Sequence, residues 1–148
     1  MPYPNHPVGC PNWGKNELCP PKVGRFDDEI LEFKQHFLVI TTFDFGKYKQ
    51  IRRSGHPDWT DNQVKCLLYY QNSVKKLVRE KVNDIFRSGM VLGCGSGIKA
   101  NGKPVPSMEA VGIDVFTTLK RLGIELQRNP EDRIVFSCLI CTNEGLRK

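Results

Sequence analysis

Cysteines are the residues of this chain best suited to chemistry, because a thiolate can bind a metal or act as a nucleophile. The chain has six of them. Residues 1–4 show no charged-then-apolar secretion signal, so we expect a cytoplasmic protein. Cytosolic thiols stay reduced, and cysteines in such chains are more often metal ligands or catalytic groups than disulfides. The question is therefore which of the cysteines can meet.

Cys10 and Cys19 are each followed directly by a proline. They lie in residues 1–24, a segment so rich in proline and glycine that it cannot form a regular helix or a central strand. Proline after a thiolate is common around metal clusters, because it fixes the chain that leaves the ligand. Eight residues separate the two thiols, which is wider than the Cys-x-x-Cys clip of zinc ribbons. We predict that the pair binds a metal, and two buried thiols in a loop are the alternative.

Cys94 lies between two glycines, in the segment GCGSG of residues 93–97. Small residues let the backbone approach a bound group, and backbone amides in such a turn favour a thiolate. The spacings of the dinucleotide-binding motif and of the P-loop are absent, and no helical pattern follows the glycines, so a nucleotide site is disfavoured. We interpret Cys94 as a third metal ligand.

Cys138 and Cys141 form a Cys-x-x-Cys pair at the end of an apolar run, residues 134–140, that predicts a buried strand. Positions three apart in a strand face opposite sides of a sheet, so both thiols can bind one metal only if the strand ends near Cys141. Cys141 is therefore the better candidate to reach a site, and we predict that Cys138 is a core thiol. Cys66, beside two leucines on a predicted helix, is also predicted to lie in the core.

His6 is the histidine best placed to join a cysteine site, because it stands four residues before the first cysteine. His36 and His56 have no candidate ligand close to them in the sequence. A lone histidine is more often a surface or core polar group than a metal ligand. Glu109 and Asp114 stand near the start of a predicted helix, where we interpret them as a favourable charge and a capping or hydrogen-bonding group.

The composition is that of a soluble globular domain of 148 residues, with 39% hydrophobic and 26% charged residues, which excludes disordered and collagen-like classes. The longest uncharged apolar stretch, residues 37–43, is far shorter than the roughly 20 residues that a membrane span requires. The net charge of +6 is compatible with a small anionic substrate or an acidic partner protein. Basic residues are scattered among acidic ones, which disfavours a nucleic-acid partner.

Strand and helix patterns alternate along the chain and predict an α/β fold, a single-domain sandwich with a small mixed sheet flanked by helices. Thr60 and Gln63 form a capping-box pattern at one helix start, and Gly123 suits a left-handed helix end. The basic segment 47–57 is predicted to be turn-rich. The α/β core is predicted for residues 25–148, with helices at about 27–36, 60–87 and 107–122 and strands at 37–43 and 134–140.

Three motifs resemble a prokaryotic family described as predicted metal-binding proteins: CPNWGK at residues 10–15, CPP at 19–21 and PSMEAVGIDV at 106–115. Members of that family show a CPNYGK-like start, a CPP and a late PSMEA-x-GIDV. The order and approximate spacing agree over most of the chain, and the last motif is the most specific. The resemblance implies an α/β fold and a cysteine-bound metal, in the form of an iron–sulfur cluster.

The chain lacks two features of that family's pattern: a further cysteine before the CPN motif, and a CRLCxxC-like stretch, which is reduced here to GCG at residues 93–95. If the family binds one cluster through the early pair and the middle stretch, the resemblance implies Cys10, Cys19 and Cys94 as its ligands. The fourth ligand then comes from Cys141, from His6 or from outside the protein. A cluster with one open iron would be a Lewis-acid site.

The leading hypothesis is a [4Fe-4S] protein of anaerobic metabolism, which acts in redox or sulfur-related chemistry or as an accessory to a larger enzyme. One alternative is an adaptor without catalytic activity that zinc holds together and whose basic surface docks a protein partner. The other is a metal-free thiol enzyme with Cys94 as its nucleophile. Metal content and thiol reactivity separate the three hypotheses.

Overall fold

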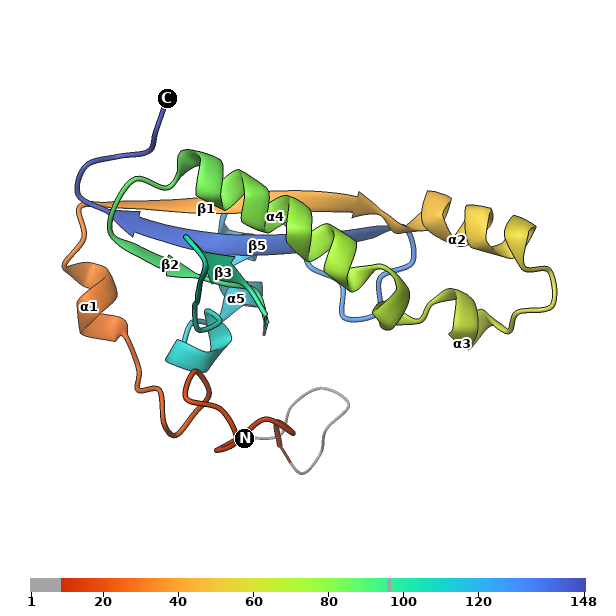
Figure 1. The fold of residues 1–148 in the computed structure, drawn as a ribbon, viewed down its shortest axis with the longest axis horizontal. Coiled ribbons are helices and arrows are strands. Elements are labelled where there is room, and N and C mark those ends of the chain that lie inside the picture. The colour runs from red at the N-terminus through yellow and green to blue at the C-terminus, as the bar shows by residue number, and fades with distance from the viewer. Residues whose placement is uncertain (1–8, 96) are drawn as a thin grey trace.

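A three-stranded antiparallel sheet with β5 at its centre is the framework of the structure (Figure 1). The structure is a computed structural model that describes residues 9–95 and 97–148. Both predicted strands are confirmed, and a third strand pairs with β5 on its other side. The strands are β1 (Gln35–Asp44), β2 (Met90–Leu92) and β5 (Arg133–Thr142), in the order β1-β5-β2.

The burial of the strands follows their place in the sheet. β5 has a partner on each side, and its second half is almost wholly buried. β1 pairs with β5 over its whole length, from Gln35 opposite Thr142 to Asp44 opposite Arg133, yet only Val39 of β1 is fully buried. β1 is therefore an edge strand, which explains why its apolar run is only half covered.

Helix α4 (Gln71–Ile85) packs on one face of the sheet. Its buried residues Val74, Val78 and Val82 recur every four positions, which places them on one side of the helix. Val78 and Val82 contact a cluster that includes Cys138 and Ile140 of β5. Each fully buried side chain of this size contributes about 1.5–3 kcal/mol of hydrophobic stabilisation.

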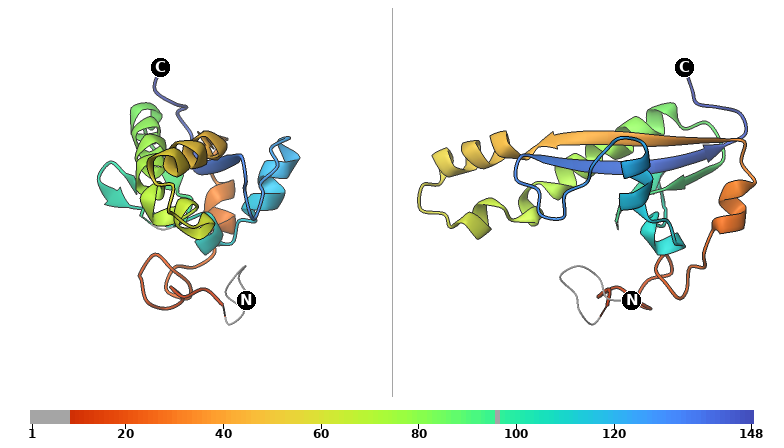
Figure 2. Two further views of the ribbon diagram at one scale, coloured as in Figure 1. Left: turned by 90° about the vertical axis from the view of Figure 1, so that its right-hand side faces the viewer. Right: turned by 180° about the vertical axis from the view of Figure 1, so that it is seen from behind.

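The other face of the sheet is covered by shorter elements, so that α4 and α5 lie on opposite sides of it (Figure 2). α5 (Val115–Arg121) and the 3₁₀ turn η2 (Glu109–Val111) contribute the buried side chains of this second cluster, together with Leu92 and Met108. α1 (Asp27–Leu31) joins its edge through Ile30. α1 is shorter than predicted, because β1 begins at Gln35 and takes in the last residues assigned to the helix.

One prediction was wrong at the end of the molecule where α2 (Phe45–Gly55) and α3 (Asp61–Val64) lie: the basic segment 47–57 is mostly helix. The Asp44 side chain accepts a hydrogen bond from the Lys47 amide and caps α2. The buried Lys49 forms an ion pair of 2.5 Å with Glu131, far along the chain. This helix is held by its cap, by the packing of Phe45 and Tyr48 in an aromatic cluster with Tyr70, and by a distant charge.

The long predicted helix from residue 60 is also divided. Its capping box is confirmed, with the Gln63 amide donating to Thr60 Oγ1 and the Thr60 amide donating to Gln63 Oε1. α3 then stops, and the short 3₁₀ turn η1 (Leu67–Tyr69) precedes α4. Within the described residues, no helix has the length and apolarity that crossing a membrane would need.

The predicted helix at 107–122 is divided at Gly112, whose φ is +99°. Asp114 caps α5 by accepting a hydrogen bond from the Thr117 amide, which confirms its predicted capping role. The left-handed Gly123 ends α5, with the Ile124 amide donating to Leu119 O, as predicted. A small hairpin, β3 (Lys99–Ala100) and β4 (Lys103–Pro104), occupies the loop expected before η2.

Candidate metal centre

The turn that carries Cys94 is fixed to the start of η2 by a parallel bridge between Gly93 and Ser107. The Gly93 amide donates to Pro106 O at 2.8 Å, and the Met108 amide donates to Gly93 O at 2.9 Å. A Cβ on Gly93 would lie 2.8 Å from the Cβ of Ile98, so only glycine fits at this position. Cys94 therefore follows β2 at a junction that backbone hydrogen bonds hold in place.

Cys94 contacts Cys138 across the sheet. The register of β2 on β5 pairs Leu92 with Leu139. The residues that continue the two strands beyond this pair bring Cys94 close to Ser137 and Cys138. The two thiols share a hydrogen bond, and the Cys94 sulfur also accepts one from the Ser137 amide. Cys138 is 0% exposed and Cys94 is half-buried, so one thiol of the pair is accessible and the other is covered.

The contact gives the two thiols different acidities. The pKa of the Cys94 thiol is lowered from its ordinary value, first because the Cys138 S–H group donates to the thiolate, and further by the Ser137 amide and Lys75. Burial and the negative charge of Glu109 oppose this shift. The pKa of the Cys138 thiol is raised, because that proton is held in the bond to Cys94 and because the site is buried. Cys94 is therefore the more acidic thiol of the pair.

Cys141 lies apart from this pair. It stands opposite His36 of β1 and Met90 of β2, and it is 0% exposed. Burial alone raises its pKa to about 11. Cys138 packs with the cluster under α4, and strand alternation therefore directs Cys141 to the opposite face of the sheet.

Cys10 and Cys19 lie in an amino-terminal segment without helix or strand over its described residues 9–24, as predicted. The segment is closed by the Gly14 amide, which donates to Pro20 O at 2.7 Å. Both thiols are half-buried. Two residues that follow, Val23 and Phe26, pack against the cluster that includes Leu92, Met108 and Val111.

A cleft of about 200 Å³ opens beside Cys94. Glu109 and Arg133 line it with charge, and Phe116 and Leu126 line it with apolar surface. Ser137, which donates its amide to the Cys94 sulfur, also lines the cleft. A small molecule in the cleft would therefore be close to the more acidic thiol.

Comparison with known proteins identifies the family. A family model with the description "Predicted metal-binding protein (DUF2284)" matches residues 6–141. The chain belongs to this family. The match runs from His6 to Cys141 and so includes every cysteine of the chain and the histidine weighed as a metal ligand. The chain has no significant match among curated proteins or among solved structures.

Membership of this family supports a bound metal in general, and the donor chemistry fits one. Thiolates are soft ligands that select zinc, copper(I) and iron–sulfur clusters. Over residues 9–95 and 97–148, however, no three His, Cys, Asp or Glu side chains are grouped closely enough to hold a metal ion. The structure brings together two thiols, Cys94 and Cys138, and the roles of Cys10, Cys19 and Cys141 as ligands stay predictions. His6 lies outside the described residues.

The contact of Cys138 with Cys94 was not predicted from the sequence. The predicted place of Cys138 in the core is confirmed, but its thiol also contacts Cys94. Aligning the apolar run 90–92 antiparallel to 139–141 would have placed the two thiols together. The other two histidines have structural partners, since His36 Nε2 lies 2.8 Å from Ile30 O and the His56 ring stacks on Trp59.

The lowered pKa of Cys94 predicts a distinct reactivity in metal-free protein. We expect the alkylation rate of Cys94 by iodoacetamide to stay high at a lower pH than the rate of N-acetylcysteine, because the thiolate persists there. C138A removes the donor to that thiolate and should shift the profile to higher pH, whereas C141A should leave it unchanged. Peptide mass spectrometry at a series of pH values measures the rates. Identical Cys94 profiles in C138A and in the unmodified chain would contradict the prediction.

Proposed function

We propose that the chain binds a [4Fe-4S] cluster through four cysteines and acts in redox or sulfur-related chemistry or as an accessory to a larger enzyme. The observation that carries this proposal is the contact between Cys94 and Cys138. Two thiols already side by side lose little further freedom when they bind a metal. The pair is therefore suited to be the fixed half of a metal centre.

Cys10 and Cys19 are proposed as the other half. Val23, four residues after Cys19, packs against the same cluster as Leu92, two residues before Cys94. Four residues span at most about 14 Å and two at most about 7 Å, so Cys19 and Cys94 are each tethered to a residue of this cluster, which covers the face of the sheet opposite α4. The Phe26 amide fixes this cluster further by donating to Val111 O at 3.2 Å.

Cys138 is preferred to Cys141 as the fourth ligand in this proposal. Cys138 shares the face of the sheet on which Cys94 packs, whereas alternation directs Cys141 to the other face. Cys141 also has backbone neighbours on both sides, in β1 and β2, which hold it inside the sheet. Moving it to Cys94 would break strand pairing.

A bound cluster would supply one-electron transfer. The chain's own groups act on the sulfur ligand: the Ser137 amide donates to Cys94, and Lys75 stabilises its negative charge. The cleft beside Cys94 leaves room for a small molecule, with Glu109 and Arg133 as its charged groups. These features support a centre that is accessible from one side.

A metal-free thiol enzyme is the second candidate function, and the same cleft favours it. The lowered pKa of Cys94 raises the fraction of nucleophilic thiolate at neutral pH. Glu109 lines the cleft, and its charge is close enough to act on the pKa of Cys94. Its carboxylate is the group that would exchange a proton with a bound substrate.

Metal analysis of anaerobically purified protein tests the proposal. We expect a brown protein with broad absorption near about 400 nm and about four iron and four sulfide per chain. One zinc per chain without iron would indicate a structural zinc site and would overturn the redox proposal. Protein that stays metal-free after reconstitution with iron and sulfide, and that has one fast-reacting thiol, would favour the thiol enzyme.

A further inference from the structure

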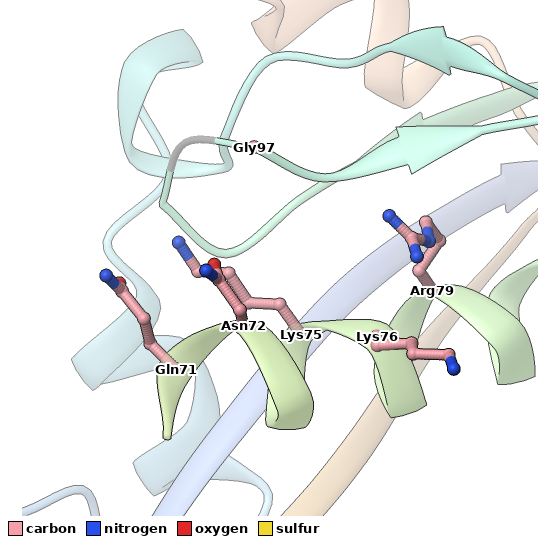
Figure 3. A pocket seen from close by; sticks show the side chains of 6 residues that line it. All are labelled: Gln71, Asn72, Lys75, Lys76, Arg79 and Gly97. Carbon is pink, nitrogen blue, oxygen red and sulfur yellow. The ribbon is translucent and has the colours of Figure 1, made fainter. Parts of the chain in front are cut away.

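A groove with a volume of about 490 Å³ runs along the first turns of α4 (Figure 3). Amide and basic side chains line one wall, and a glycine backbone lines the other: Gln71, Asn72, Lys75, Lys76, Arg79 and Gly97. We propose that this groove binds a small molecule that carries phosphate groups. None of the described residues that line the groove is a proposed metal ligand.

The helix places these side chains on one surface. Positions 71, 75 and 79 follow each other at steps of four, and positions 72 and 76 lie beside them. The apolar residues 74, 78 and 82 take the buried side of the same helix. In Figure 3, Gln71, Lys75 and Arg79 extend from α4 toward the segment that carries Gly97.

The groove gathers positive charge. Lys75 and Arg79 are like charges four residues apart, which destabilises a helix slightly in the absence of an anion. Arg79 has no ion pair or hydrogen bond with the described part of the chain, and Lys76 has only a distant one, 3.7 Å from Glu80. A bound phosphate would offset the repulsion, and the planar guanidinium group of arginine matches phosphate oxygens in pairs.

The opposite wall permits a close approach. Gly97 has a φ of +88°, and a Cβ there would meet nothing within 4 Å. Glycine at positive φ leaves backbone exposed where a side chain would otherwise project, and backbone amides in glycine turns form anion-binding concavities. The same turn begins with Cys94, on which Lys75 acts electrostatically, so the groove is next to the thiol pair.

A small molecule fits this groove better than a nucleic acid. The basic lining of the groove ends at Arg79, because Glu80 and Asp84 follow on the next turns of α4 and the exposed Lys81 lies outside the groove. None of the described residues that line the groove is aromatic, whereas single-stranded nucleic acids are bound by aromatic stacking along an extended basic path.

Calorimetric titration of inorganic pyrophosphate into the full chain, purified anaerobically, tests the proposal. We expect one binding site whose affinity falls as salt is raised. R79Q and K75Q should each weaken binding about tenfold or more, because each removes a charged donor, and R79K should retain part of the affinity. K81Q is the matched control, because Lys81 is exposed on the same helix outside the groove, and its affinity should equal that of the unmodified chain.

Pyrophosphate also chelates metals, so the same titration is repeated on the full chain after a chelator has removed any bound metal. A site in the groove predicts the same pyrophosphate affinity with and without the metal. Loss of binding in the metal-free chain, at an unchanged content of folded protein, would place the anion on the metal centre and overturn the proposal. Absence of binding, equal weakening by K81Q in chains with the same melting temperature, or binding of a single-stranded RNA oligonucleotide in place of pyrophosphate would also overturn it.

Discussion

Alanine in place of Cys138 is expected to remove the metal from the anaerobically purified chain, whereas alanine in place of Cys141 leaves its metal content unchanged. Cys138 contacts the accessible thiol of Cys94, and Cys141 faces the other side of the sheet. In the proposed four-cysteine site, loss of the Cys138 thiolate would open the cluster to solvent and remove one of the bonds that hold it. Iron and sulfide per chain, with the absorbance near about 400 nm, measure the effect.

The two variants are closely matched. Both thiols lie on β5, both are 0% exposed, and both substitutions remove one sulfur atom from the interior. Any loss of stability through the cavity should therefore be similar, and a difference in metal content reports the ligand role. C10S, C19S and C94S should lose the metal as C138A does, and C66S should retain it. Metal loss in C141A with retention in C138A would restore Cys141 as the fourth ligand.

The elements that could be predicted from the sequence are those whose cause is local. The run 134–140 is apolar and rich in β-branched residues, and it forms β5. The capping box at Thr60 and the left-handed Gly123 act within a few residues of themselves. In each of these cases the residues that stabilise the element lie inside the pattern that predicts it.

The elements that were missed depend on distant residues. α2 buries only Phe45 and Lys49, and the partner of Lys49 is Glu131. The long helix is interrupted before Tyr70, whose ring stacks on Phe43 of β1 with 5.3 Å between centroids. Leu67 and Leu68 match the helical spacing but are 50% and 72% exposed, because this packing, rather than periodicity, sets the path of the chain.

In the candidate site, too, the residues with local signals could be predicted and the contact between distant residues could not. Cys10, Cys19 and Cys94 stand in short motifs with proline or glycine neighbours, so each could be selected from its own surroundings. The pairing of Cys94 with Cys138 requires the register of β2 on β5, which brings together residues 44 positions apart. A strand of three residues has too weak a pattern to fix that register from the sequence alone.

Alanine in place of Gly89 is expected to destabilise the fold by about 3 kcal/mol or more, which lowers the melting temperature by roughly 10 °C in a chain of this length. Gly89 precedes β2 and has a φ of +112°. A Cβ at this position would lie 2.1 Å from the Cys141 carbonyl oxygen. Cys141 cannot retreat, because it pairs with His36 on one side and with Met90 on the other.

G123A is the control that separates the two causes of this cost. Gly123 also has a positive φ, +79°, but a Cβ there would meet nothing within 4 Å. Its substitution should therefore cost only the backbone strain, about 1–2 kcal/mol. Thermal and denaturant unfolding of both variants gives the difference, and that difference measures the close approach of Gly89 to β5. Equal destabilisation by G89A and G123A would mean that β5 can shift at Cys141, and would remove the argument that strand pairing holds that cysteine away from Cys94.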